Sequence, residues 1–133
     1  MADTVTSQTI QDDNRKAVLK FTNISDGTGE SAVTKIDVSA LQANSRGDAC
    51  TEVAISKIWW QCVGMGVELL NDATTDTLII ALSPDSNGMH DYSSFSAIPN
   101  DAGSGKTGDV KFTTIGASSG DTYTVILEVL KSF

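Results

Sequence analysis

Cysteine, proline and positive charge are all scarce in this chain. It has two cysteines and two prolines in 133 residues, and nine Lys and Arg against seventeen Asp and Glu, which gives a formal net charge of −8. Two cysteines cannot make a disulfide framework. Because binding to nucleic acid depends mainly on Lys and Arg neutralising phosphates, the acidic balance argues against a nucleic-acid partner. It favours a partner with a basic surface.

Long apolar runs are also missing. Runs such as Val125–Leu127 are far shorter than the roughly 20 residues that a membrane-spanning helix needs, so no membrane partner is predicted. The N-terminus has neither a basic region nor an apolar segment, and we expect no secretory signal. With 40% hydrophobic and 20% charged residues, the chain is expected to bury an ordinary core as one domain.

The stretch Glu52–Val63 holds both tryptophans and Cys62. Val53 and Ile55 alternate with smaller or polar residues, and the apolar positions then slip by one, so that Ile58, Trp60 and Cys62 share the other set. A slip of one residue would turn these side chains to the opposite face of a strand. A β-bulge near Ser56-Lys57 would keep both sets on the core side, and it leaves Trp59 and Gln61 facing outward.

The remaining segments are short, alternating and separated by turn-forming residues, which predicts strands and not helices. Leu78–Leu82 and Tyr123–Leu130 are apolar on both faces, so we expect both to be covered on both sides. Eight or nine strands at this spacing predict an all-β fold, an antiparallel β-sandwich with the jelly roll as one candidate topology. We assign residues 14–133 to a single sandwich domain and residues 1–13 to an N-terminal arm or edge strand.

No motif for catalysis, metal binding or a cofactor stands in the required context. Gly103–Thr107 resembles the end of a phosphate-binding loop, but Asn100 occupies the place of the first glycine and a strand follows in place of a helix. His90 is the only histidine, and no serine lies in a nucleophile elbow. The two cysteines lie too far apart along an extended segment to bridge, so both are expected to be reduced. The sequence therefore predicts no enzyme, no metal site and no cofactor.

Two features predict an interaction surface. Trp59 is a large side chain on the outer face if the bulge forms, and such residues recur as interface anchors; the alternative is that another strand or sheet covers it. The extended segment from Ala2 to Asp12 could add a strand to a neighbour's sheet, or be a plain first strand. The candidate interface residues are Val5, Thr6, Gln8, Ile10, Trp59 and Gln61.

Four stretches resemble small structural proteins of tailed-bacteriophage virions. They are Lys20–Glu30, Lys57–Gln61, Gly108–Gly116 and Gly120–Val125. The resemblance is to an overall pattern and not to a catalytic signature. It implies a non-enzymatic virion protein, first of all a capsid decoration (cement) protein that is made in the host cytoplasm and lies on the capsid exterior. The implied partners are the major capsid protein and further copies of the chain, with a trimer favoured.

Two other functions fit the same residues. The first is a neck, tail or fibre-associated virion subunit. The second belongs to a different class, a carbohydrate-binding β-sandwich in which Trp59 and Tyr92 stack on sugars.

Overall fold

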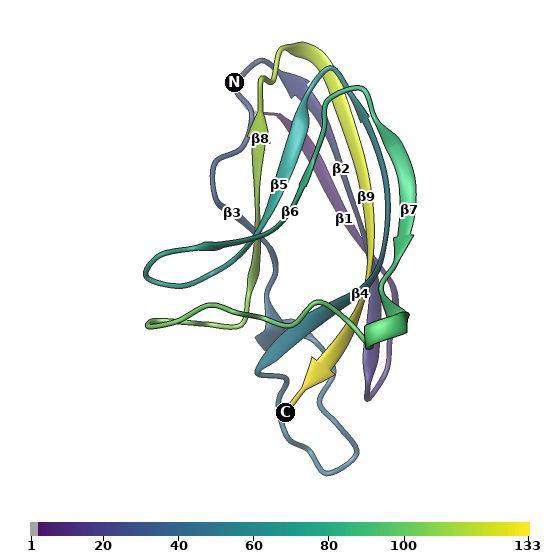
Figure 1. Cartoon of the computed structure of the whole chain (residues 1–133), viewed down its shortest axis with the longest axis vertical. Coiled ribbons are helices and arrows are strands. Elements are labelled where there is room, and N and C mark those ends of the chain that lie inside the picture. Colours follow the sequence, from purple (N-terminus) through teal and green to yellow (C-terminus); the bar gives the residue numbers. More distant parts are fainter. Residues whose placement is uncertain (1–2) are drawn as a thin grey trace.

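The structure is a computed structural model that describes residues 3–133. Its nine strands form two antiparallel sheets that face each other (Figure 1). Sheet A has the order β1-β2-β9-β4-β7, and sheet B has the order β3-β8-β5-β6. The elements are β1 (Thr4–Asp12), β2 (Lys16–Asp26), β3 (Val33–Ile36), the 3₁₀ turn η1 (Val38–Ala40), β4 (Glu52–Val63), β5 (Gly66–Asn71), β6 (Thr77–Leu82), β7 (Asn87–Asp91), the 3₁₀ turn η2 (Ser93–Phe95), β8 (Val110–Ile115) and β9 (Ser119–Ser132). The predicted antiparallel β-sandwich is confirmed.

The strand pairing is that of a jelly roll with one strand added. From β2 onward the strands pair as β2 with β9, β3 with β8, β4 with β7 and β5 with β6. This is one long antiparallel ribbon rolled into two four-stranded layers. β1 then pairs with β2 and becomes the fifth strand of sheet A. Residues Thr4–Asp12 are thus an edge strand of their own sheet, one of the two roles predicted for residues 1–13, of which residues 1 and 2 lie outside the described part of the chain.

The core lies between the two sheets and follows from the alternation along each strand. In β2 the buried apolar side chains are Ala17, Leu19 and Phe21, and in β9 every second residue from Tyr123 to Val129 is buried. Phe112 of β8 connects the two sheets, because its ring packs edge-on against the Phe21 ring, with 5.3 Å between the ring centroids. The buried thiol of Cys62 is part of this core, and both cysteines are free, as predicted.

The bulge predicted in β4 is present. The register between β4 and β9 shifts between Ile55 and Lys57, which leaves Ser56 as the extra residue. Val53, Ile55, Ile58 and Cys62 all face the core as a result. Trp59 is half-buried and Gln61 is exposed on the outer side of sheet A, as the bulge requires.

Two predictions about covered strands are wrong. Ile126 and Leu130 of β9 lie on the outer face of sheet A and are only half-buried, because the second sheet covers the other face. β6 is the edge strand of sheet B, and Leu78 is 51% exposed. Apolar side chains on both faces of a strand therefore did not mark an interior position here.

Candidate interaction surface

The outer face of sheet A can be followed residue by residue across its strands. One row runs from Gln8 through Lys20, Ile126 and Trp59 to Met89, each lying opposite the next. Side chains directly opposite one another in antiparallel strands lie on the same face of the sheet. Trp59, whose neighbours in this row are Ile126 and Met89, thus lies on the strand next to the β7 edge of the face.

The next two rows toward the N-terminal end of β1 are mostly polar. Thr6 lies opposite Thr22, Thr22 opposite Thr124, and the row ends at Gln61 and Asn87. The Thr6 and Thr22 hydroxyls are hydrogen-bonded to each other. The third row consists of Thr4, Ile24, Thr122 and Val63, each opposite the next, so hydroxyl and apolar side chains alternate along it. The face therefore combines hydroxyls and amides with a few apolar side chains.

These three rows contain no carboxylate, and Lys20 is their only charged residue. We call them the acid-free face, and they comprise Thr4, Thr6, Gln8, Lys20, Thr22, Ile24, Trp59, Gln61, Val63, Asn87, Met89, Thr122, Thr124 and Ile126. The chain as a whole has seventeen Asp and Glu residues. The absence of acids from these described positions contrasts with the rest of the surface.

A row of charged residues borders the acid-free face on the side of the bulge. The Glu128 carboxylate lies 3.3 Å from the Lys16 amine and 3.8 Å from the Lys57 amine. Lys57 in turn lies opposite Asp91 in β7, and the charge of Lys57 contributes to lowering the pKa of Asp91 after the larger effect of hydrogen bonds from Ser93. Charges of both signs thus neutralise each other along this border, and the face beyond it stays nearly uncharged.

The surface is hollowed beside Trp59. A shallow depression of about 200 Å³ is lined by Trp59, Trp60, Gln61, Gly88, Thr124 and Ile126. Gly88 lies against the ring of Trp60, and a β-carbon there would come within 3.2 Å of that ring. The depression therefore offers an aromatic side chain, an amide and a hydroxyl at one place on the face.

The structure does not place Tyr92 with Trp59. Trp59 shares the outer face with Met89, whereas Trp60 and His90 belong to the alternate set of positions. The centroid of the His90 ring lies 4.9 Å from that of Trp60 and 5.8 Å from that of Tyr92. The Tyr92 ring in turn packs against the Phe95 ring. Tyr92 is therefore part of a separate row of aromatic rings along β7 and η2.

Four of the six predicted interface residues fall on one face. Thr6, Gln8, Trp59 and Gln61 all belong to the acid-free face, although they come from strands far apart in the sequence. Val5 lies opposite Asn23, so it faces the inner side of sheet A, and Ile10 is the unpaired residue of a second bulge. The sequence did not reveal Thr22, Thr124 or Ile126, because only the register between strands places them beside Trp59.

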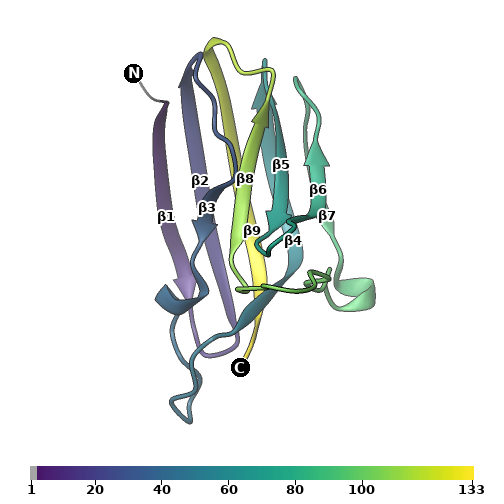
Figure 2. The same cartoon turned by 90° about the vertical axis from the view of Figure 1, so that its left-hand side faces the viewer.

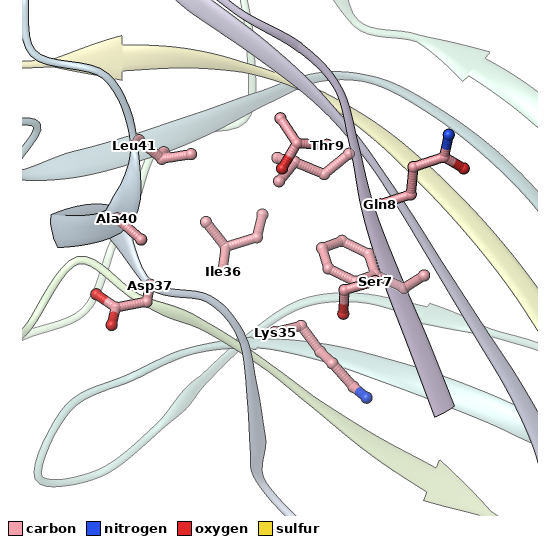
Figure 3. A pocket seen from close by; sticks show the side chains of 10 residues that line it. Ser7, Gln8, Thr9, Lys35, Ile36, Asp37, Ala40 and Leu41 are labelled. Carbon is pink, nitrogen blue, oxygen red and sulfur yellow. The ribbon is translucent and has the colours of Figure 1, made fainter. Parts of the chain in front are cut away.

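A groove lies beneath β1, where sheet B no longer covers sheet A. It has a volume of about 190 Å³, with Ser7 and Thr9 on one wall and Ile36 and Leu41 on the other (Figure 3). Leu19 and Phe21 line it as well. Residues Thr4–Gln11 of β1 are exposed throughout, so both faces of this strand reach solvent.

A buried polar cluster fixes the end of the sandwich near the start of β1. Glu30 and Lys35 form an ion pair at 2.5 Å with side chains only 6% and 4% exposed. The Tyr123 hydroxyl donates a hydrogen bond to Glu30 at 2.5 Å, and burial together with this carboxylate raises the pKa of Tyr123. Asn23 donates to both Glu30 and Asp3, at 2.9 and 3.0 Å. These contacts are structural, since they tie β1, β2 and β9 to the loop before β3.

The loop that resembles a phosphate-binding motif is held by other contacts. The Lys106 amine lies 3.0 Å from Glu52, and the Thr107 hydroxyl donates to Asp72 at 2.7 Å. Residues Gly103–Thr107 form an exposed loop with no helix after it. Among residues 3–133, no group of three or more His, Cys, Asp or Glu is placed to hold a metal ion. The described part of the chain also has no helix of the length and apolarity needed to span a bilayer.

No protein-family model matches the chain, and no curated protein is similar to it.

Proposed function

We propose that this chain is a non-enzymatic virion structural protein, a decoration protein that binds the outside of a phage head and stabilises the shell. The observation that carries the proposal is the acid-free face. Surface charge keeps a protein soluble and separate from its neighbours. A face without a carboxylate, on a chain of net charge −8, is suited to being covered.

The composition of this face also fits a protein contact. Trp and Met are enriched in the cores of protein interfaces, whereas Asp and Glu are depleted there. With strands about 4.8 Å apart and the three rows about 7 Å apart along them, the face measures roughly 20 Å by 15 Å. That is about 300 Å², less than the roughly 800 Å² that a standard stable interface buries on each partner. One copy would therefore bind modestly. Many copies bound to the assembled shell, and not to its free subunits, would stabilise the shell by mass action.

The fold supports this class only by analogy. Jelly rolls recur in viral capsid proteins and in lectins, and one fold serves many functions. The remaining acids give the rest of the surface a negative potential, which favours a shell whose outer surface is basic around the docking position.

The experiment uses particles from a phage in which this gene is deleted. Purified chain is added to these particles, and the bound fraction is measured by co-sedimentation. Gln61→Glu adds one carboxylate to the acid-free face with almost no change of shape, and we expect binding to weaken about tenfold. Gln42→Glu makes the same chemical change in an exposed loop outside the face and should bind as the wild type does. Equal binding by both variants would reject the face as the docking surface, and no binding by the wild type would reject the decoration role.

A second candidate function is carbohydrate binding, which the depression beside Trp59 favours. An aromatic ring next to the Gln61 amide and the Thr124 hydroxyl is a combination that can hold a sugar. An array of neutral oligosaccharides would test it. Binding that Trp59→Ala removes, and that Phe95→Ala retains, would favour this function, whereas no bound glycan would reject it.

A further inference from the structure

We propose that two copies of the chain associate through β1, which pairs with its own symmetry mate in antiparallel fashion around a two-fold axis at Ser7. The two copies of sheet A then form one continuous sheet, and the two acid-free faces lie side by side. The proposal rests on β1 as a sheet edge and is independent of what the acid-free face binds.

Three of the four sheet edges carry features that prevent pairing with another strand. β3 has only four residues, and its register shift falls at Lys35, whose charged side chain points into the protein toward Glu30. β6 is interrupted by a register shift at Ile79. β7 has five residues, ends at Asp91 and is followed at once by η2. Short strands, bulges and inward charges are the usual ways in which proteins block their edges.

β1 lacks these features over most of its length. It has nine residues, and the stretch Thr4–Thr9 is in regular register with β2 before the bulge at Ile10. This stretch contains no charged residue and no proline. It forms the outermost strand of the molecule, where sheet B does not reach it (Figure 2). A long, regular and uncharged edge is a template for another strand.

The sequence of β1 fits a second copy of itself. Pairing centred on Ser7 sets Val5 opposite Thr9 of the second copy and Thr6 opposite Gln8 of the second copy. Each of these pairs joins positions on the same face, since Val5, Ser7 and Thr9 face inward and Thr6 and Gln8 face outward. Residues directly opposite must share a face in any continuous sheet. The register is therefore compatible with two-fold symmetry without a further bulge.

Charge also selects this edge for contact between copies. Each chain has a net charge of −8, so two copies repel at most orientations. The acid-free face and the regular part of β1 form one uncharged margin, broken only by Lys20. In the pair, Val5, now 45% exposed, would be covered by Thr9 of the second copy at the rim of the groove beneath β1. The edge thus offers unpaired backbone groups for hydrogen bonds, apolar cover and little charge repulsion.

The test is the molar mass of the purified full-length chain, measured by sedimentation velocity from micromolar to millimolar concentration. Wild type should pass from one copy to two. Thr6→Lys with Gln8→Lys sets two lysines opposite each other across the pair and should weaken the dimer by about tenfold or more. Thr6→Lys with Gln8→Glu sets opposite charges there instead and should restore or strengthen the dimer. Because both variants carry the same Thr6→Lys change, a difference between them comes from residue 8, which lies opposite Lys20 of its own chain and opposite residue 6 of the second copy. The urea midpoints of the variants measure the first of these contacts, and the molar mass reports the second.

Asn87→Lys with Met89→Lys serves as the control, because it adds two lysines to the β7 edge on the same face. It should dimerise like the wild type, and circular dichroism and urea midpoints confirm that each variant is folded. A wild type that stays monomeric, a stable trimer, or equal self-association of the two β1 variants would overturn the proposal. These results are obtained without particles, so they leave the decoration role to its own test.

Discussion

The Ser56 hydroxyl lies 2.9 Å from Oε2 of Glu128 and 3.0 Å from the Glu128 carbonyl oxygen, at the point where β4 has one residue more than β9. This contact occupies the polar group of the extra residue, which is buried. It therefore stabilises the bulge that keeps Ile58 in the core and Trp59 on the outer face.

Ser56→Ala removes this hydroxyl and leaves the Glu128 carbonyl and carboxylate with one partner fewer. We expect a loss of about 1–2 kcal/mol in the free energy of unfolding, because one of the lost hydrogen bonds is to a charged group. Urea denaturation followed by tryptophan fluorescence measures it. Ser94→Ala, at an exposed position in η2, should change the stability little. Equal stability of both variants would show that the bulge does not depend on the hydroxyl.

Lys35→Met breaks the buried ion pair and leaves the Glu30 carboxylate without its cation. The expected cost is roughly 3–5 kcal/mol, because an uncompensated charge remains in the interior. Lys35→Met combined with Glu30→Gln should cost less than Lys35→Met alone, since no isolated charge is left. Denaturant midpoints of the three proteins give the comparison. If the double variant is less stable than the single one, the isolated Glu30 carboxylate is not the source of the loss, and this account of its energetics is wrong.

The contact between Asp72 and Lys111 predicts how stability depends on pH. The hydrogen bond from Lys111, with a second from Thr107, holds the pKa of Asp72 below its ordinary value of 3.8. The charged Asp72 carboxylate therefore adds to the free energy of unfolding above pH 3.8, and this addition is lost as the pH falls through the lower pKa of Asp72 in the folded protein. The same contact raises the pKa of Lys111 above 10.5. The stability that the charged Lys111 amine adds is therefore lost as the pH rises through this raised pKa.

Asp72→Asn should flatten the fall in stability on both the acid and the alkaline side. Urea midpoints measured from about pH 2 to about pH 11 check this. Asp48→Asn removes an exposed carboxylate elsewhere and should leave the alkaline limb as it is in the wild type. An unchanged profile in Asp72→Asn would show that the contact is not maintained in solution.

Gly108 and Gly47 form a matched pair, with backbone φ angles of +90° and +87°. A β-carbon at Gly108 would lie 1.9 Å from the carbonyl oxygen of Thr51, whereas one at Gly47 would meet nothing within 4 Å. Gly47→Ala should therefore cost only the left-handed strain, about 1 kcal/mol. Gly108→Ala must also move the backbone and should cost clearly more. Thermal unfolding of both variants tests this, and equal losses would contradict the close approach.

Alternation and turn residues predicted the sandwich, and the slip in parity at Ser56-Lys57 predicted the bulge. These features succeeded because they depend on one strand and on which of its faces is buried. The jelly-roll pairing of β2 with β9 joins residues about one hundred positions apart and leaves no local trace. The exposed edge position of Leu78 was missed for the same reason, since an apolar strand reads alike at the edge and in the interior.

The candidate site was predicted only in part. Trp59 and Gln61 could be placed on the outer face from the bulge alone, whereas Thr6 and Gln8 were predicted only as part of an extended N-terminal arm or edge strand. That these residues lie together on one face follows from the pairing of β1, β2, β9 and β4, which the sequence does not encode locally. The missing carboxylates are likewise visible only after the strands are aligned.

The central claim is that the chain works by docking on a phage head through the acid-free face. Cryo-electron microscopy of the parent particle at subnanometre resolution tests it most directly. The account predicts density for the sandwich on the outside of the shell, with the outer face of sheet A turned toward the major capsid protein. Density found only at the neck or tail, or particles without the chain, would contradict it.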